Sequence, residues 1–525
     1  MNTLKPLPTG IQTFSEIIEG GYLYVDKTAL VHQLTCTCKY VFMSRPRRFG
    51  KSVLCSTLKS YFEGRSDLFR GLAMEQLETE WRHHPVLLIS LATMKGGTRQ
   101  EFYDKIDVQL SRYERQFGLS KPSSDPGARL QYLIEQTPAL TGERAVVIID
   151  EYDAPLLTVL HEPERLVEMR QTVRSFLGCL KDCDPYLRFV FITGITKFSQ
   201  VSIFSELNNL DKITMMPQYS TICGITQEEL QTQMMPHVEQ LAADNGLTVE
   251  ETLARLKRNY DGYHFARDLK DVYNPYSLWQ AFKWGEIKDF WFDTGTPSSL
   301  LNMLEKFGAR VVDFDDGCLC EAHEFDAPTE KMTTAMPFFY QSGYLTIKDY
   351  DPDFRTYRLG FPNKEVEHGF VEFLAKYYIP QERGYNSAFI ADFVRDVRKG
   401  EAEKFMQRLD ALFASGDYQV AGDAELYFQN AVWVIFKMIG FYTEVERHTT
   451  DGRMDMLIQT QDFIYIIEFK LDKSADEALQ QIKDKQYAKP FEHDTRTLYE
   501  IGVNFSSRTR RIEGWKIQKL ERLSV

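Results

Sequence analysis

The sequence predicts an α/β protein that begins with a parallel β-sheet covered by helices on both faces. The main observation is an alternation within residues 1–225, where apolar segments of strand length are separated by segments with helical spacing. This order is typical of parallel strands joined by crossover helices. A second observation is that polar residues follow several of these strands directly, and ligands of such sheets bind at the carboxyl ends of the strands. Strands are expected at residues 40–43, 85–91, 145–149 and 187–192.

The helices of this first region follow from the spacing of their apolar residues. Helical periodicity is present at about 99–117, 127–137 and 165–182, between the predicted strands. Asp26 precedes another apolar helical face, which is typical of a helix N-cap. A polar residue this close to the first strand could instead approach a ligand.

From Thr226 onward the pattern becomes mainly helical. Residues 344–361 then have the pattern of a β-hairpin that turns at Asp351-Pro352-Asp353. Helices followed by such a hairpin fit a winged-helix-like module, and we expect a mainly helical middle region at 226–410.

The C-terminal segment, 411–525, predicts a small α/β domain. A helix is expected at about 424–438, followed by short strands at 452–458 and 463–470 and a helix at about 474–489. The sequence therefore predicts three parts, with the boundaries 1–225, 226–410 and 411–525.

Gly50-Lys51-Ser52 lies between the first predicted strand and a segment with helical spacing. Strand, tripeptide and helix in that order are the context of a phosphate-binding loop. Backbone N–H groups at the helix start would face an anion, Lys51 would reach the outer phosphates, and Ser52 would hold Mg²⁺. The full pattern places a glycine where this chain has Arg45. A basic, solvated strand-to-helix loop is the alternative interpretation.

The strand at 145–149 ends in two carboxylates, Asp150 and Glu151. An apolar strand with this ending is the usual partner of a phosphate-binding loop. Asp150 would bind Mg²⁺ through water, and Glu151 would polarise the attacking water. An acidic surface turn is the alternative, but two half-motifs in this order disfavour it.

The strand at 187–192 leads into a second polar tip. Thr193 is a candidate sensor of the outermost phosphate, and Lys197 is a candidate charge stabiliser. A Thr-Gly sequence at a strand end is also simply a turn. Together with Gly50 and Asp150, Thr193 would lie at the carboxyl edge of the sheet.

The C-terminal strands predict a second site. Alternation places Ile466, Glu468 and Lys470 on one face of their strand, beside a neighbouring strand that carries Asp455. Two neighbouring carboxylates bind a divalent metal, and a lysine beside them can orient or activate water, as metal-assisted phosphodiester hydrolysis requires. Gln481 and Tyr487, on the helix that follows, are available to the same site. An edge strand with ordinary surface charges is the alternative.

Composition narrows the classes of partner. The formal net charge of −13 argues against a chain coated in nucleic-acid-binding surface, although it does not exclude a local basic groove. A basic C-terminal tail could contact a phosphate backbone or form the solvated face of a helix. Its basic residues are Arg508, Arg510, Arg511, Lys516, Lys519 and Arg522.

The cysteine and hydropathy patterns limit the possible cellular locations of the protein. The eight cysteines form no C-x-x-C pair, which disfavours a structural zinc site. No apolar segment has the length of a membrane span, and the first residues lack the pattern of a signal peptide. We therefore expect a cytoplasmic protein that does not enter a membrane.

Several stretches resemble a bacterial family of predicted proteins with an AAA-ATPase-like N-terminal domain and a PD-(D/E)XK nuclease-like C-terminal domain. They span almost the whole chain and are YVDKT (24–28), RPRRFGKS (45–52), VVIIDEYDAP (146–155), FVFITGITKFSQVSIFSELNNL (189–210), YDGYHF (260–265), VYNPYSL (272–278), GRMD (452–455) and IYIIEFK (464–470). The resemblance implies a P-loop NTPase sheet followed by a nuclease-like domain, and the RPRRFGKS stretch accommodates Arg45.

The resemblance also implies roles for single residues. Lys51 and Ser52 would hold phosphate and Mg²⁺, and Asp150 and Glu151 would be the metal-binding and water-activating acids. The nuclease core would consist of Asp455, Glu468 and Lys470, with Glu425 as a weaker fourth member.

Two functions compete on this basis. In the first, the protein hydrolyses ATP and couples it to a Mg²⁺-dependent nuclease that acts on DNA or RNA. In the second, ATP loading acts as a regulatory switch, and the C-terminal domain binds nucleic acid or protein without cutting. A P-loop fold that binds no nucleotide is a third interpretation. The sequence identifies no arginine finger, so a homo-oligomer is left open.

Overall fold

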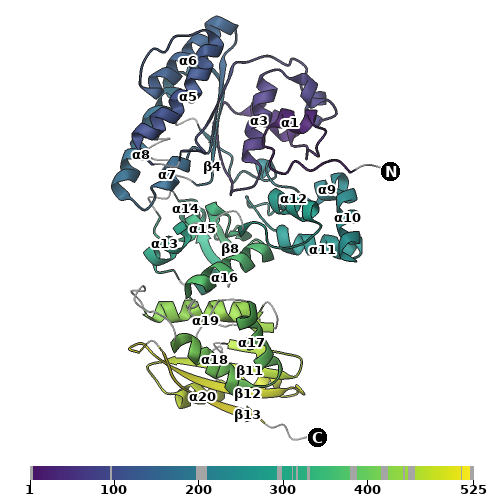
Figure 1. The fold of residues 1–525 in the computed structure, drawn as a ribbon, viewed down its shortest axis with the longest axis vertical. Helices are drawn as coiled ribbons and strands as arrows, with labels where there is room; N and C mark the ends of the chain where they lie inside the picture. The colour runs from purple at the N-terminus through teal and green to yellow at the C-terminus, as the bar shows by residue number, and fades with distance from the viewer. Residues whose placement is uncertain are drawn as a thin grey trace. The chain divides into compact units, whose positions relative to one another are not determined.

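The computed structural model describes residues 4–94, 97–196, 210–292, 298–309, 311–314, 317–327, 332–378, 387–414, 424–440, 444–446, 456–509 and 511–520. The chain forms two compact units (Figure 1). The first consists of Met1–Ala309 and Phe314–Glu367, and the second of Arg310–Asp313 and His368–Val525.

A five-stranded parallel sheet forms the centre of the first unit, in the order β2-β3-β4-β1-β5. The strands are β1 (Tyr40–Ser44), β2 (Val86–Ser90), β3 (Ala145–Asp150), β4 (Leu187–Gly194) and β5 (Asp211–Lys212). Because β4 lies between β1 and β3, the segments that follow these three strands meet at one edge of the sheet. The predicted parallel sheet is confirmed.

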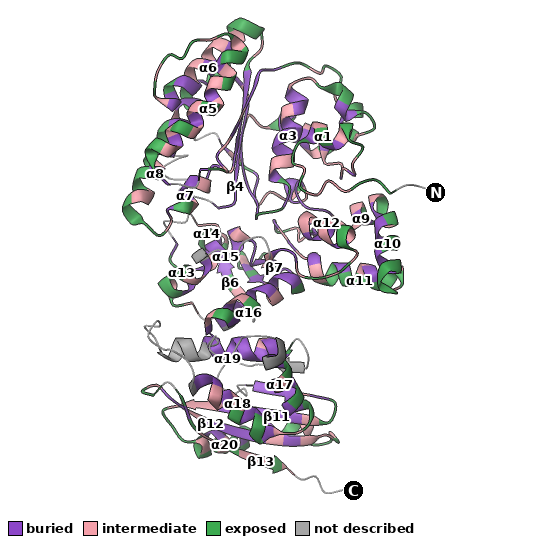
Figure 2. Ribbon diagram, in the orientation of Figure 1, coloured by how far each residue is buried: buried purple, intermediate pink, exposed green. Residues whose placement is uncertain are grey.

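Helices cover both faces of this sheet (Figure 1). On one face lie α5 (Arg99–Phe117), α6 (Pro126–Thr141) and α8 (Pro163–Asp182), and on the other lie α1 (Phe14–Glu19) and α3 (Lys51–Phe62). Every residue of β1 and of β3 is buried, as expected for strands packed on both sides (Figure 2). Leu133, Val173 and Phe176 belong to the apolar core between β3 and the first group of helices.

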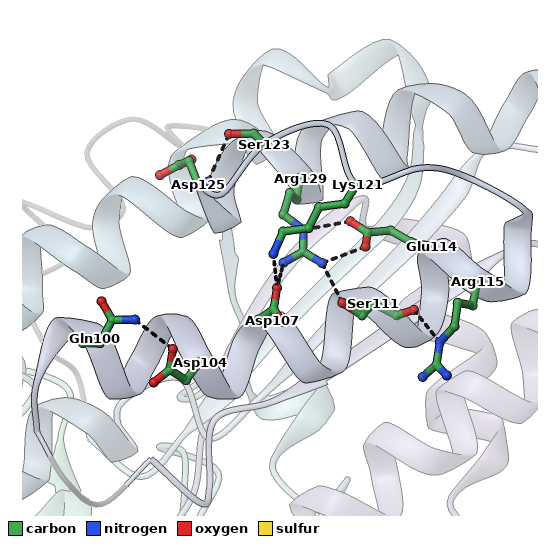
Figure 3. Close-up of polar contacts among 10 residues, drawn as sticks. All are labelled: Gln100, Asp104, Asp107, Ser111, Glu114, Arg115, Lys121, Ser123, Asp125 and Arg129. Carbon is green, nitrogen blue, oxygen red and sulfur yellow. Dashed lines mark hydrogen bonds and ion pairs between the residues drawn. The ribbon is translucent and has the colours of Figure 1, made fainter.

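A buried ion-pair network joins α5 to α6 (Figure 3). The guanidinium of Arg129 is fully buried, and it donates to both carboxylate oxygens of Glu114 at 2.8 and 2.7 Å. It also donates to Ser111 at 3.0 Å and to Asp107, which forms a second ion pair with Lys121 at 2.6 Å. Because the charge of Arg129 is matched on several sides, the pair of helices can bury it.

Asp26 lies beside the start of α2 (Thr28–Thr37). Its carboxylate accepts hydrogen bonds from the Thr28 backbone at 2.8 Å and from the Ala73 backbone, at the start of α4 (Ala73–Leu77), at 2.7 Å. The N-cap position of α2 is occupied by Lys27. Asp26 therefore caps the helix from the position before the N-cap, and not from the N-cap position that the sequence predicted.

The first unit continues into a helical region. It contains α9 (Gln227–Gln233), α10 (Met235–Asn245), α11 (Val249–Tyr260) and α12 (Pro275–Trp284), then α13 (Ser298–Phe307), α14 (Ala322–Phe325) and α15 (Met336–Ser342). Capping boxes at Thr226 and Thr248 start α9 and α11.

The expected hairpin is present in this region. It consists of β7 (Thr346–Asp351) and β8 (Thr356–Gly360), and β6 (Cys318–Glu321) adds a third antiparallel strand in the order β6-β8-β7. A mainly helical middle region is confirmed, and the winged-helix-like interpretation stays a prediction. α16 (Lys364–Tyr378) runs from the end of the first unit into the second.

A mixed five-stranded sheet forms the second unit, in the order β13-β12-β11-β10-β9. The strands are β9 (Glu444–Glu446), β10 (Met456–Gln459), β11 (Phe463–Leu471), β12 (Thr497–Ser506) and β13 (Arg511–Leu520). Only the β11–β12 pair is parallel among these neighbours. The helices are α17 (Ser387–Arg398), α18 (Ala402–Ala414), α19 (Ala424–Gly440) and α20 (Ala475–Asp484).

The basic tail corrects one interpretation of the sequence. Residues 511–520 form the edge strand β13, which pairs with β12, and not a solvated helix face. Lys516 forms an ion pair with Asp476 at 2.5 Å, and the Trp515 indole donates to Glu403. Arg510 and Arg522 lie outside the described residues.

In the part of the chain that the structure describes, none of the helices combines the length and the apolar character needed to span a lipid bilayer.

Candidate functional sites

The loop after β1 leads directly into α3. Gly50 is the N-cap of α3 and has φ of 85°, a left-handed conformation that glycine adopts at little cost. No side chain caps the first turn of α3, so its backbone N–H groups remain available to an anion. Arg48 also has a positive φ, of 70°, and for an arginine this conformation costs on the order of 1 kcal/mol.

Lys51 is buried at the base of this loop, with 5% of its surface exposed. Its ammonium donates to the backbone carbonyls of Arg45 at 3.0 Å and of Pro46 at 2.9 Å. Burial lowers the pKa of Lys51, and the nearby carboxylates of Glu151 and Asp150 act in the opposite direction. The loop therefore holds a buried cation within electrostatic reach of both predicted acids.

Ser52 and Asp150 are in direct contact. The Ser52 hydroxyl donates to Oδ2 of Asp150 at 2.7 Å. The other oxygen, Oδ1, is buried and has no hydrogen-bond partner within the described ranges. A hydroxyl beside a carboxylate with an unused oxygen is the donor set that suits Mg²⁺, so these residues fit the metal that the sequence predicted.

Glu151 follows Asp150 in a left-handed conformation with φ of 54°. Its side chain is half-buried and lines the same cavity as Lys51 and Ser52. Burial raises the pKa of the Glu151 carboxyl, while the charge of Lys51 opposes that rise. A carboxylate with these surroundings is suited to accept a proton from water.

The cavity around these residues has a volume of about 610 Å³ and belongs entirely to the first unit. Its walls come from the phosphate-binding loop, the segments after β3 and β4, and aromatic residues further along the chain. Its polar and charged residues include Gln12, Arg47, Arg48, Lys51, Ser52 and Glu151, and its aromatic wall is made of Trp291, Phe292, Phe338 and Tyr344.

Asp153 holds the polar tip of β4 in place. The sequence analysis did not identify this role of Asp153. Its buried carboxylate accepts from the backbone N–H groups of Ile195 at 3.0 Å and Thr196 at 2.7 Å, and from the Thr196 hydroxyl. Gly194 lets this carboxylate approach, because an added Cβ would lie 2.5 Å from its Oδ1. The Asp-Glu-Tyr-Asp sequence was the available signal, since its fourth residue is a second carboxylate after a strand.

Thr193 itself is fully buried, and its hydroxyl has no hydrogen-bond partner among the residues described. The residues of this tip that line the cavity are Ile195 and Thr196. Thr193 is therefore buried beneath the cavity lining and does not itself line the cavity. Lys197, the other candidate at this tip, lies outside the described residues.

Arg45 occupies the position of the expected glycine without entering the cavity. Its guanidinium is buried, donates to the backbone carbonyls of Thr214 at 2.8 Å and Tyr219 at 3.1 Å, and lies 4.2 Å from the ring centre of Phe265. The side chain anchors the loop to distant segments. The departure at this position therefore leaves room for phosphate.

The second candidate site lies on β11, in the second unit. Glu468 is buried, and its Oε1 accepts from Lys470 at 2.9 Å, which confirms that both residues occupy one face of the strand. Gln481 of α20 donates to the same oxygen. Gly502, opposite Glu468 on β12, allows α20 to lie this close, because an added Cβ would be 2.3 Å from the Ala475 carbonyl oxygen.

Other residues expected at this site are only partly placed. Asp455 lies outside the described residues, and Glu425 lies in α19 at a position whose side chain is not described. Tyr487 is buried near the end of α20. Across the described ranges, no group of three or more His, Cys, Asp or Glu side chains is arranged to hold a metal ion. The observed part of this site is therefore the contact of Glu468 with Lys470 and Gln481.

Comparison with known proteins matches two regions of the chain to known families. Residues 8–204 match the family described as Predicted AAA-ATPase, and residues 423–515 match the PD-(D/E)XK nuclease superfamily. A protein from Azotobacter chroococcum mcd 1, named "Uncharacterized protein in vnfD 5'region", is 34% identical over 98% of this chain and 99% of its own length. The chain belongs to the predicted AAA-ATPase family with a C-terminal PD-(D/E)XK nuclease domain.

The two matches divide the candidate residues of this predicted AAA-ATPase cleanly. The first match contains Lys51, Ser52, Asp150, Glu151 and Asp153. The second contains Glu425, Asp455, Glu468, Lys470 and Gln481. The helical region between them, which supplies Trp291, Phe338 and Tyr344 to the cavity, lies outside both matches.

Proposed function

We propose that the protein binds and hydrolyses ATP at the first site. The observation that carries this proposal is the 2.7 Å contact between Ser52 and Asp150, beside Lys51 and Glu151 on one cavity. These residues come from segments after two different strands, and a structural surface turn would not require them to converge. The match to the Predicted AAA-ATPase family supports the same function.

Each residue has a distinct task in this proposal. The N–H groups at the start of α3 and the Lys51 ammonium bind the outer phosphates. Ser52 and Asp150 hold Mg²⁺, which when bound would neutralise charge on the phosphate oxygens. Glu151 orients the attacking water and accepts its proton, and Asp153 keeps the tip of β4 in position. Thr193 would sense the outermost phosphate from its buried position at the end of β4.

We also propose that the C-terminal domain is a metal-dependent nuclease that acts on phosphodiester bonds of DNA or RNA. Asp455 and Glu468 would hold the metal ion, and Lys470 would orient the water. The buried position of Glu468 beside Lys470 supports this assignment, as does the match to the PD-(D/E)XK superfamily. In this proposal the domains are 1–225, 226–410 and 411–525, and ATP gates or positions the nuclease.

One experiment tests both activities. Purified protein is incubated with ATP, Mg²⁺ and a mixed pool of DNA and RNA, while phosphate release and strand cutting are followed together. We expect Lys51→Ala to abolish phosphate release and Asp455→Ala to abolish cutting. Glu468→Gln serves as a second variant of the nuclease site. Full cutting by clean Asp455→Ala and Glu468→Gln proteins would refute the nuclease assignment.

A second candidate function, a regulatory switch without cutting, is favoured by one observation. Lys470 and Gln481 both donate to the Oε1 atom of Glu468, and a bound metal would compete with them for this oxygen. Titration with Mn²⁺ separates the two functions. The nuclease predicts metal binding that Glu468→Gln weakens, whereas a switch predicts the same metal affinity in both proteins.

A further inference from the structure

The cavity contains an arginine whose role the sequence did not indicate. Arg47 is exposed and lines the cavity together with Lys51, Ser52 and Glu151. Its guanidinium makes no hydrogen bond or ion pair with any residue in the described ranges, while five N–H donors are available on such a group. It is therefore ready to bind an anion that enters the cavity.

The other two arginines of this loop are engaged elsewhere. Arg45 is buried and bonded to the carbonyls of Thr214 and Tyr219. Arg48 lies over the ring of Tyr276 on α12, 4.6 Å from its centre. Arg47 and Arg48 both line the cavity, but Arg48 also lies over an aromatic ring, so Arg47 is the one of the three with no partner in the described ranges.

The charge of Arg47 reaches the part of the cavity where hydrolysis would occur. Arg47 lines the same cavity as Glu151, and its positive charge acts on that carboxylate. Burial raises the pKa of the Tyr344 hydroxyl, and Arg47 opposes the rise. Arg47 therefore lies within electrostatic range of both the proposed base and the aromatic wall.

We propose that Arg47 contacts the outermost phosphate and stabilises the charge of the transition state from within the same chain. This inference rests on the proposed ATP hydrolysis. The bond between the water oxygen and the γ-phosphorus forms as the bond to the leaving ADP breaks, and Glu151 accepts the proton of the water. In many phosphoryl-transfer enzymes this charge comes from an arginine of a second protein. Here turnover would require no second copy of the chain.

The test compares Arg47→Ala and Arg47→Lys with Arg112→Ala, a substitution of an exposed arginine on α5. Single-turnover phosphate release and the affinity for a fluorescent ATP analogue are measured separately. We expect Arg47→Ala to slow release by about 10³-fold with little change in affinity. Arg47→Lys should recover part of the rate, because it keeps the charge but loses the planar fork. Arg112→Ala should behave as wild type.

A mixing experiment separates action within one chain from action between chains. Arg47→Ala retains Lys51, and Lys51→Ala retains Arg47, so a mixture would regain activity if the arginine acted on a neighbouring chain. We expect no recovery and a rate per chain that stays constant on dilution of the wild type.

The outcomes separate this inference from the proposed function. Wild-type protein that releases no phosphate would refute the ATPase itself. Active wild type with an equally fast Arg47→Ala variant, a loss of affinity with an unchanged single-turnover rate, or recovery on mixing would each overturn the assignment of Arg47.

Discussion

The hydroxyl of Ser52 donates a 2.7 Å hydrogen bond to Oδ2 of Asp150, which lies 98 residues further along the chain. This contact joins the helix after β1 to the end of β3, across the strand β4 that separates them. Because Oδ1 of the same carboxylate is buried without a partner in the described structure, the pair is prepared for a cation.

Removal of the Ser52 hydroxyl should therefore weaken the binding of Mg²⁺ at this pair. We expect Ser52→Ala to raise the Mg²⁺ concentration needed for half-maximal ATP hydrolysis by at least about tenfold. Ser52→Thr keeps the hydroxyl and should retain near-normal behaviour. A Mg²⁺ titration at saturating ATP measures the effect, and identical curves for wild type and Ser52→Ala would argue against a metal at this position.

Glu151→Gln should separate binding from hydrolysis. The amide keeps the size of the side chain but cannot accept the proton of the attacking water, so hydrolysis should fall by about 10²–10⁴-fold. Binding of ATP should persist, because Lys51 and the start of α3 are unchanged. Equilibrium binding of labelled ATP and single-turnover phosphate release check the two parts. A variant that hydrolyses ATP at the wild-type rate would remove Glu151 from the mechanism.

Gly194→Ala should destabilise the tip of β4. The added Cβ would lie 2.5 Å from Oδ1 of Asp153 and 2.7 Å from the ring of Tyr152, so both contacts must be relieved by a local shift. Overpacking of this kind costs about 1–3 kcal/mol. Unfolding in urea measures the effect. The quantity compared is the midpoint of the transition that shifts when ATP is added, because that transition reports on the first unit. Gly514→Ala is the control, because nothing lies within 4 Å of its added Cβ.

Arg129→Met should destabilise the first unit strongly. The substitution leaves the buried carboxylate of Glu114 without its bidentate partner, which costs about 3–5 kcal/mol. Lys121→Met removes an exposed partner of Asp107 and should cost less than about 1 kcal/mol. Thermal unfolding of both variants tests the difference. The double substitution Arg129→Met with Glu114→Leu should recover much of the loss, because no buried charge is left unpaired.

Asp261 should make stability fall as pH rises. Its carboxylate is buried, and within the described residues neither of its oxygens has a hydrogen-bond partner. Burial, with a smaller contribution from Asp271, raises its pKa from 3.8 to about 6. The folded state therefore binds a proton more tightly than the unfolded state, and this contribution is lost between about pH 4 and pH 6.

Asp261→Asn should flatten that dependence. The neutral side chain does not ionise, so the stability of the variant relative to wild type should be greater at pH 8 than at pH 4. Denaturant titrations at both pH values provide the measurement. An unchanged pH profile would show that the Asp261 carboxyl is not the group responsible.

The sequence predicted the central elements well because their signals are local. The helix expected at 99–117 begins and ends at those residues, since Thr98 caps its start and Gly118 its end. The strand expected at 145–149 continues one residue to Asp150. The edge strand β13 was not predicted, because its apolar residues Ile512, Trp515, Ile517 and Leu520 do not alternate strictly and fit a helical face about as well as a strand.

The candidate sites also contain some features that the sequence could predict and others that it could not. Convergence of Ser52 with Asp150 could be predicted, because parallel strands bring their carboxyl ends to one edge. The position of Arg47 could not, because three neighbouring arginines look alike in a sequence and only their partners distinguish them. Asp153 was missed for a related reason, since its hydrogen bonds to Ile195 and Thr196 depend on the close approach of Gly194.

The anchoring of Arg45 has a mechanical consequence. Its backbone carbonyl accepts from Lys51, and its side chain is tied to Thr214, Tyr219 and Phe265. Lys51 would give up this hydrogen bond on turning toward an incoming phosphate, so the residue that loses a partner is the one that also holds Thr214, Tyr219 and Phe265 against the loop.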